Sequence, residues 1–293
     1  MVDLNNKEEQ KIVDMPDFTI ADMAKAGIHF GHNISVRNPK AQHFIYGETN
    51  NTHIIDLRKA HFALKRALYV LYKFARQDKK ILFVSTAQKF YDQVKEIADA
   101  CGQYYVRSWK GGMLTNWKTI VASIKELRKY RKILENIENK KEGENSTRYT
   151  KKEITMMHKR KEKLEESFGG VIDMNGMPDL VVVFSLANEE LAVNETRCIG
   201  TPVIGIADTD SDPTNIEYPI PGNDDSLRAM KFYCSLFSAA IIKGTQEWMQ
   251  QSGIKANEKK AERAENDAKN QRERSERSEK AKSKPKKEEA GNK

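Results

Sequence analysis

The stretch Leu180-Val-Val-Val-Phe-Ser-Leu-Ala-Asn-Glu-Glu-Leu-Ala-Val-Asn-Glu-Thr-Arg-Cys-Ile-Gly-Thr-Pro-Val-Ile-Gly-Ile206 decides the fold. Its first five residues and residues 202–206 are short apolar runs rich in β-branched side chains, and each run predicts a strand. Residues 188–199 between them predict a helix. A strand, a helix and a second strand in this order are typical of a parallel sheet covered by helices.

The same order occurs earlier in the chain. Ile81-Leu-Phe-Val84 predicts a strand that is buried on both faces, and Tyr104-Tyr-Val106 predicts a second strand after a helix at residues 90–100. Further helices are expected at residues 59–75 and 226–247, and short strands at residues 44–46 and 52–57. We therefore expect an α/β fold of the flavodoxin or Rossmann type, with a doubly wound, mostly parallel sheet.

A long charged segment separates the two halves of this pattern. Between Lys118 and Phe168 apolar residues recur every three or four positions, and Thr150-Lys-Lys-Glu153 matches a helix-capping box. This pattern predicts an inserted antiparallel hairpin of two helices with a narrow, coiled-coil-like apolar seam. The expected organisation is then a flexible N-terminus (1–16), a discontinuous α/β domain (17–117 and 170–250), the helical hairpin (118–169) and a charged disordered tail (254–293).

The positive charge of the chain is concentrated at its end. From Lys255 to Lys293 there are 14 Lys and Arg against nine Asp and Glu, so this tail carries five of the eight net positive charges. The body is close to neutral, and net charge alone is weak evidence for a nucleic-acid partner. Three separated cysteines, a polar N-terminus and no long apolar run predict a cytosolic protein that does not enter a membrane.

Two polar clusters could indicate a metal or an enzyme. His29 and His32 lie three residues apart, but no carboxylate or cysteine accompanies them at a known ligand spacing, so a tight packing loop is the preferred interpretation. Asp208-Thr-Asp-Ser-Asp212 follows a predicted strand at the edge where doubly wound folds bind ligands, so a small-molecule enzyme with a site at Asp208–Asp212 remains the alternative. An Asx-rich turn is the simpler explanation. No phosphate-binding glycine motif, no Ser/His/Asp or Cys/His set and no known metal-ligand spacing is present, so we expect no catalytic residue, cofactor, metal or small-molecule substrate.

Several stretches together resemble one family. They are Ala26-Gly-Ile-His-Phe-Gly-His32, Arg37-Asn-Pro-Lys40, His53-Ile-Ile-Asp-Leu57, Trp109-Lys-Gly-Gly-Met-Leu-Thr-Asn-Trp117, Gly176-Met-Pro-Asp179, and Ala207–Pro213 with Tyr218–Asp225. In this order they are similar to the bacterial-type small-subunit ribosomal protein S-two family, over residues 17–245. The resemblance implies a doubly wound domain with a helical hairpin. It also implies binding to small-subunit ribosomal RNA, docking of the neighbouring ribosomal protein S-one, and a location on the small ribosomal subunit in the cytoplasm.

The expected RNA contacts follow from this resemblance and from side-chain chemistry. Cations neutralise phosphates, amides bind sugars, and aromatic faces stack on bases. The chain departs from the family pattern at Arg37, Ser108 and Lys110, where the family commonly has an aromatic residue, an arginine and a leucine. The RNA-binding candidates are Arg37, Asn38, Lys40, Arg107, Trp109, Lys110, Asn116, Lys125, Arg128, Lys129, Arg131, Lys132, Lys159 and Arg160.

The junction Arg107–Trp117 is expected to serve as the root of the hairpin. Gly111-Gly112 and Trp117 should fix how the hairpin leaves the α/β body, with Trp117 anchored in the core, whereas Trp109 could be buried or exposed. Arg107 and Lys110 are expected to face RNA. Interleaved Glu residues on the hairpin leave ordinary i,i+4 pairing open as the explanation of its basic clusters, and a pure protein-interaction surface remains a further hypothesis.

Overall fold

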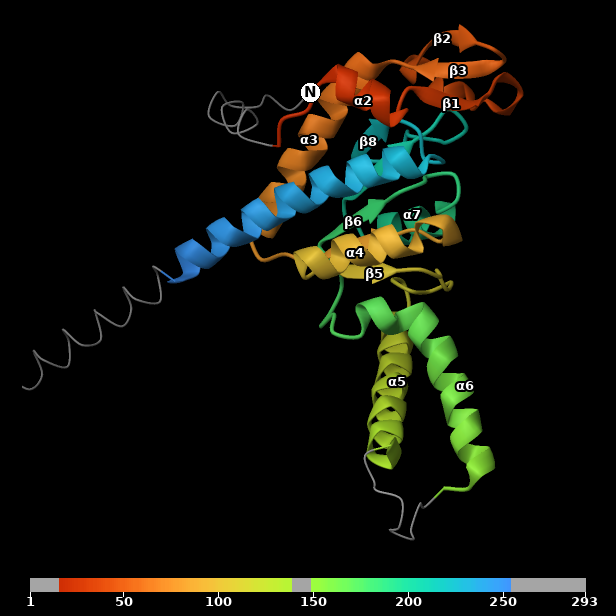
Figure 1. The fold of residues 1–293 in the computed structure, drawn as a ribbon, viewed down its shortest axis with the longest axis vertical. Coiled ribbons are helices and arrows are strands. Elements are labelled where there is room, and N and C mark those ends of the chain that lie inside the picture. Colours follow the sequence, from red (N-terminus) through yellow and green to blue (C-terminus); the bar gives the residue numbers. More distant parts are fainter. Residues whose placement is uncertain (1–15, 139–148, 254–293) are drawn as a thin grey trace, which may run out of the picture. The chain divides into compact units, whose positions relative to one another are not determined.

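The computed structural model describes residues 16–138 and 149–253 (Figure 1). The described residues up to Thr245 belong to one compact unit, and a second unit begins at Gln246. The expected charged tail, nearly all of the expected N-terminal segment, and the polar turn of the hairpin lie outside the described residues. Within residues 16–138 and 149–253, no helix combines the length and the apolar character that crossing a membrane requires.

A five-stranded sheet forms the centre of the first unit. All its neighbouring strands are parallel, and their order across the sheet is β5-β4-β6-β7-β8. The bounds are β4 Ile81–Val84, β5 Tyr104–Val106, β6 Leu180–Val183, β7 Val203–Ala207 and β8 Tyr218–Pro221. β4 and β6 are adjacent although the hairpin separates them in sequence, so the α/β domain is assembled from both halves of the chain. This arrangement confirms the doubly wound α/β prediction.

Helices cover both faces of this sheet, which explains why its central strands are uniformly apolar. Alternate residues of each strand point to opposite faces, and β4 and β6 are buried throughout. One face packs against α2 Ile20–Ala26, α3 Leu57–Ala75, α4 Tyr91–Cys101 and the part of the helix at residues 227–253 that lies in the first unit. The other face packs against α7 Glu190–Cys198 and the first turns of α5 Trp117–Glu138.

The inserted hairpin consists of α5 Trp117–Glu138 and α6 Lys151–Phe168, which Figure 1 shows side by side. Ile120, Ile124 and Leu127 of α5 are buried in the same core as Phe168, which ends α6. The predicted capping box is present, because Thr150 caps the Glu153 N–H while the Glu153 carboxylate accepts from Thr150. The α/β core therefore anchors the root of the hairpin.

A 3-10 turn, η4 Gly169–Val171, returns the chain from the hairpin to the body. Gly170 lies directly against β5, because a Cβ built on it would lie 2.3 Å from the carbonyl oxygen of Tyr105 and 2.7 Å from its ring. No side chain fits in that space. Gly170, just after the end of α6, thus makes a close contact between the hairpin root and the edge strand of the sheet.

A separate antiparallel sheet lies near the N-terminal end of the described chain, with the strand order β1-β3-β2. Its strands are β1 Phe30–Asn33, β2 Ile45–Thr49 and β3 Thr52–Ile55, and the 3-10 turns η1 Ile34–Val36 and η2 Pro39–Phe44 follow β1. The expectation that residues 26–32 form only a tight loop is wrong for their second half, because Phe30 pairs with Ile54. A last 3-10 turn, η3 Gln88–Phe90, precedes α4.

Candidate nucleic-acid interface

The junction between the body and the hairpin is organised around one buried carboxylate. Glu195 of α7 is 6% exposed. Its Oε1 accepts hydrogen bonds from Trp109 Nε1 at 3.1 Å and from the Gly112 N–H at 2.8 Å. Its Oε2 accepts from the Leu114 N–H at 3.0 Å and from both the N–H and the hydroxyl of Thr115 at 3.3 Å. A single side chain therefore accepts hydrogen bonds from four residues of this loop.

These hydrogen bonds keep Glu195 ionised. Burial by itself raises the pKa of this carboxyl, but donors on Leu114, Trp109, Gly112 and Thr115 outweigh burial and lower the pKa below its usual value. Hydrogen bonds to a charged acceptor are also stronger than those between neutral groups. The carboxylate thus stabilises one conformation of the loop from which α5 begins.

The two tryptophans of the junction both contribute to packing. Trp109 and Trp117 are partly buried and lie against the core on the α7 face of the sheet. Arg107 is half-buried, with its guanidinium 5.6 Å from the ring centre of Tyr91 and 5.4 Å from that of Tyr105. Lys110 and Asn116 are exposed. At the root, Lys110 and Asn116 are therefore exposed, whereas Arg107 lies against two tyrosine rings and the indoles lie against the core.

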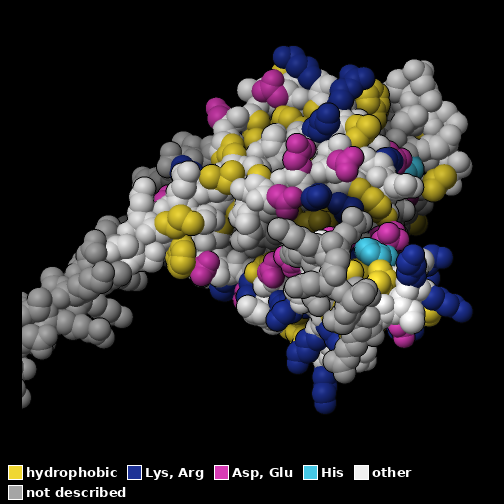
Figure 2. Space-filling model, turned by 60° about the horizontal axis from the view of Figure 1, so that its bottom comes forward, with side chains coloured by type: hydrophobic (Ala, Val, Ile, Leu, Met, Phe, Trp, Pro, Cys, Tyr) yellow, Lys and Arg dark blue, Asp and Glu magenta, His cyan; other side chains and the backbone are white. Residues whose placement is uncertain are grey.

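The exposed lysines of α5 form a stripe. Lys125, Lys129 and Lys132 stand at positions i, i+4 and i+7 and are all exposed, on the side of the helix opposite the buried residues Ile124 and Leu127. Within the described residues, no hydrogen bond or ion pair engages their ammonium groups. The i,i+4 pairing that the sequence left open is therefore absent from this stripe, which we call the α5 lysine stripe. Figure 2 brings this end of the molecule forward and shows Lys and Arg side chains projecting around it.

Other cations of the hairpin are engaged by the protein itself. Arg131 forms an ion pair with Glu165 across the hairpin, and Arg128 donates to the Ile172 carbonyl oxygen and lies 3.8 Å from Asp173. Arg160 donates to the hydroxyl of Tyr130 at 3.3 Å. Lys159 is exposed and, within the described part of the chain, has no such partner. The structure thus divides the predicted hairpin cations into unpaired lysines and paired arginines.

The loop with Arg37, Asn38 and Lys40 lies beside the turn after β7. Asn38 donates its N–H to the Thr209 carbonyl oxygen at 2.9 Å, and its side chain caps the Lys40 N–H at 3.0 Å. Lys40 forms an ion pair with Asp212 at 2.6 Å, and this pair lowers the pKa of Asp212 to about 2. Arg37 is exposed. Among these three candidates, Arg37 alone has a free charge within the described residues.

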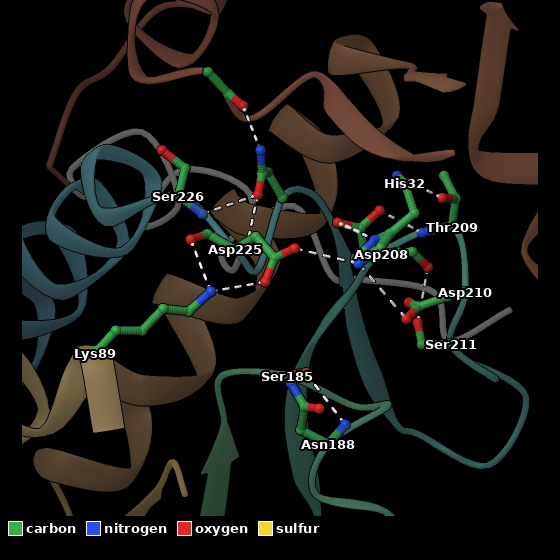
Figure 3. Close-up of polar contacts among 12 residues, drawn as sticks. His32, Lys89, Ser185, Asn188, Asp208, Thr209, Asp210, Ser211, Asp225 and Ser226 are labelled. Atoms are coloured by element: carbon green, nitrogen blue, oxygen red, sulfur yellow. Dashed lines mark hydrogen bonds and ion pairs between the residues drawn. The ribbon is translucent and has the colours of Figure 1, made fainter. Parts of the chain in front are cut away.

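Residues from three elements form an acidic cluster around His32 at the carboxyl edge of the five-stranded sheet (Figure 3). His32 Nδ1 lies 3.2 Å from Asp208 Oδ2, and His32 Nε2 lies 3.3 Å from Asp225 Oδ2. The adjacent carboxylate of Asp208 raises the pKa of His32 to about 9, against the effect of burial. Burial and the charges of Asp208 and Asp210 raise the pKa of Asp224 to about 7.

The close approach of β1 to this edge depends on a glycine. A Cβ on Gly31 would lie 2.7 Å from Thr209 Cγ2, and the next residue, His32, donates its N–H to the Thr209 hydroxyl at 3.0 Å. The Asx-turn expectation holds at Asp212, whose carboxylate caps the Thr214 N–H at 3.0 Å. Asp208 instead accepts from the N–H of the next residue, Thr209, at 2.6 Å.

Two residues of the interface were not among the sequence predictions. Glu195 gives no local signal, because a glutamate inside a predicted helix looks like a solvated side chain and its donors are about 80 residues away. Lys118 is exposed and extends the α5 lysine stripe by seven residues toward the junction. Lys118, Lys125 and Lys132 are spaced seven residues apart, and this spacing in the sequence could have identified Lys118 as part of the stripe.

Comparison with known proteins gives consistent matches. Residues 23–244 match the family model described as ribosomal protein S2. The chain is 46% identical over 241 residues to the small ribosomal subunit protein uS2 of Rickettsia felis, which covers 82% of this chain and 80% of that protein. It is 47% identical over 236 residues to the proteins of the same name from Rickettsia typhi and Rickettsia prowazekii, covering 80% of this chain and 78% of each relative.

Proposed function

Because the chain belongs to the ribosomal protein S2 family, we propose that it binds small-subunit ribosomal RNA through the α5 lysine stripe and the exposed cations beside the hairpin root. Family membership makes it a structural component of the small ribosomal subunit. It also replaces the alternative of a small-molecule enzyme at Asp208–Asp212. The acidic side chains at that edge need an explanation other than catalysis.

The observation that carries the proposal is the α5 lysine stripe. Its lysines are exposed and free of acidic partners in the described chain, so binding a phosphate there breaks no internal ion pair. Each such contact releases counterions from RNA, which makes binding favourable and dependent on salt. Lys110 at the root and Lys159 on α6 supply further exposed charge. The buried seam and Glu195 hold the helices that carry these lysines.

The test compares two triple variants of the full chain. The first replaces the stripe, Lys125→Ala, Lys129→Ala and Lys132→Ala, and the second replaces three exposed lysines of other helices, Lys73→Ala, Lys95→Ala and Lys231→Ala. Affinity for small-subunit RNA is measured by filter binding between about 50 and 200 mM salt. We expect the stripe variant to lose about tenfold or more in affinity and to show a shallower salt dependence. Equal losses of affinity in both variants would show that only the net charge of the chain matters, and would reject the α5 lysine stripe as the binding surface.

The second part of the proposal is that the chain supports docking of the neighbouring ribosomal protein S-one. The family resemblance supports this part. A compatible surface is the shallow apolar hollow of about 540 Å³ lined by Phe44, Phe62 and Pro221, in which Phe62 is 69% exposed. Small subunits carrying Phe62→Ser should contain less S-one by quantitative mass spectrometry, whereas Leu227→Ser, a change at another exposed apolar side chain, should not alter it. Unchanged S-one content would remove this hollow as the docking surface.

A further inference from the structure

We propose that His32, Asp208 and Asp224 bind a divalent cation, with Zn²⁺ as the best fit to their chemistry. One ligand atom of each residue lies within 4.8 Å of the others. His32 comes from β1, Asp208 follows β7 and Asp224 follows β8, so the site would join the antiparallel sheet to the carboxyl edge of the parallel sheet. The proposal is independent of RNA binding, and it revises the expectation that the chain holds no metal.

Unpaired buried atoms around these residues provide the first argument. Asp224 is 5% exposed, and its Oδ1 has no hydrogen-bond partner among the described residues. Nδ1 of His32 also has no well-directed hydrogen bond, and its contact is the 3.2 Å ion pair with Asp208 Oδ2. Buried polar atoms without partners are costly and rare, and a missing ion is one of their ordinary explanations.

The balance of charge provides the second argument. Asp208 and Asp224 are 2% and 5% exposed, and His32 is the basic side chain within the trio. Two lysines in this region are engaged elsewhere, Lys89 with Asp225 at 2.8 Å and Lys40 with Asp212 at 2.6 Å. Two buried carboxylates beside a single imidazole leave an excess of negative charge, and such charges are normally paired or coordinate a metal. A dication would neutralise both carboxylates.

The donor set favours Zn²⁺ over Mg²⁺. Imidazole nitrogen and carboxylate oxygen both bind Zn²⁺, and zinc sites with three protein ligands take water as the fourth, whereas Mg²⁺ prefers six oxygen ligands. Tetrahedral Zn²⁺ places neighbouring ligand atoms about 3.3 Å apart. The observed separation between His32 Nδ1 and Asp208 Oδ2 is 3.2 Å, so this pair already has the required spacing. Nδ1 would bind the metal in place of its proton.

The outer contacts also have the pattern of a metal site. When one ring nitrogen of a ligating histidine binds a metal, the other usually donates to a carboxylate. His32 Nε2 lies 3.3 Å from Asp225 Oδ2, and Lys89 holds that carboxylate in place (Figure 3). Asp208 is likewise oriented, because its Oδ1 accepts from the Thr209 N–H at 2.6 Å while Oδ2 faces His32. The ligands are thus positioned by groups that do not themselves bind the ion.

The experiment uses the untagged full chain after removal of metals by chelation. Zn²⁺ is titrated by isothermal calorimetry, and thermal unfolding is followed with Zn²⁺ or with Mg²⁺. We expect one equivalent of Zn²⁺ to bind and to raise the melting temperature, because a ligand that binds only the folded state stabilises it. Mg²⁺ at the same concentration should leave the melting temperature unchanged.

Variants distinguish this site from other histidines and carboxylates. Asp224→Asn and His32→Gln should each abolish the stoichiometric binding, whereas Asp212→Asn, a change in the neighbouring turn but outside the trio, should retain it. Circular dichroism of each variant checks that it is folded, and the absorption spectrum of the Co²⁺-substituted wild-type chain reports nitrogen and oxygen coordination independently of the variants. No binding by the wild-type chain, equal binding by the Asp224→Asn variant, or an equal effect of Mg²⁺ would each overturn the proposal.

Discussion

The indole Nε1 of Trp109 donates a 3.1 Å hydrogen bond to Oε1 of Glu195, a residue 86 positions later in the chain. This bond joins the loop before the hairpin to a helix that follows it. Glu195 also accepts from three backbone N–H groups of the same loop, so its carboxylate substitutes for the secondary structure that the loop lacks. The orientation of α5 therefore depends on a side chain of α7.

Removing this carboxylate should destabilise the folded chain. Glu195→Ala leaves the buried N–H of Leu114 and the N–H groups of Gly112 and Thr115 without their acceptor, and we expect a loss of about 2–4 kcal/mol in the free energy of unfolding. Urea denaturation at pH 7 measures it. The exposed Glu190 lies on the same helix, and Glu190→Ala should change stability by no more than about 0.5 kcal/mol. A loss of similar size in both variants would contradict the role given to Glu195.

The same carboxylate predicts a dependence of stability on pH. The pKa of Glu195 is lower in the folded chain than its ordinary value of 4.5, so the unfolded chain takes up a proton more readily. The stabilisation is complete above pH 4.5 and is lost as pH falls through the folded pKa. The difference in unfolding free energy between wild type and Glu195→Gln should be constant near neutral pH and shrink in acid. A difference that grows on acidification would contradict a lowered pKa of Glu195 in the folded chain.

Gly170 should not tolerate even one added methyl group. Its Cβ would lie 2.3 Å from the Tyr105 carbonyl oxygen, a backbone atom that can move only by displacing β5, so Gly170→Ala should cost about 2 kcal/mol or more. Gly169 is the matched control. Its Cβ would meet Glu165 Cγ at an ordinary 3.5 Å, and its φ is −57°, so Gly169→Ala should be neutral or slightly stabilising. Thermal unfolding compares the two, and equal melting temperatures would show that β5 yields.

Two neighbouring cations on α5 should behave differently toward RNA. Lys129 belongs to the α5 lysine stripe, whereas Arg131 is paired with Glu165. Lys129→Ala should weaken RNA binding and reduce its salt dependence without changing stability. Arg131→Ala should leave RNA affinity nearly unchanged and alter stability by less than about 1 kcal/mol, since both partners of this pair are 39% exposed. Filter binding measures the RNA affinity of both variants, and urea denaturation measures their stability. A larger loss of RNA affinity for Arg131→Ala than for Lys129→Ala would contradict the distinction between unpaired lysines and paired arginines.

Much of the fold follows from local sequence pattern. The apolar runs at Ile81–Val84 and Leu180–Val183 predicted buried strands, and the capping box at Thr150 marked the start of a helix. β8 was missed because Pro219 and Pro221 argue against a strand. It is nevertheless allowed, since β8 lies at the sheet edge and pairs only with β7 among the described strands.

The candidate site was less predictable, because its contacts join distant residues. Sequence reasoning identified the basic residues of the hairpin but could not separate Lys129 from Arg131, whose acidic partner is 34 residues away. Similarly, Lys40 is neutralised by Asp212, 172 positions later. Charge density is visible in a sequence, whereas the partner of each charge depends on the packing of segments that only the folded chain brings together.

The contact between Glu195 and the loop also sets an order of events during synthesis. The ribosome releases a chain from its N-terminus, so residues 107–117 and both hairpin helices emerge before α7 exists. Until then the N–H groups of Gly112, Leu114 and Thr115 have only water as an acceptor, and β4 lacks its neighbour β6. The base of the hairpin therefore acquires its final geometry late, when the second half of the domain arrives and supplies both a strand and a charge.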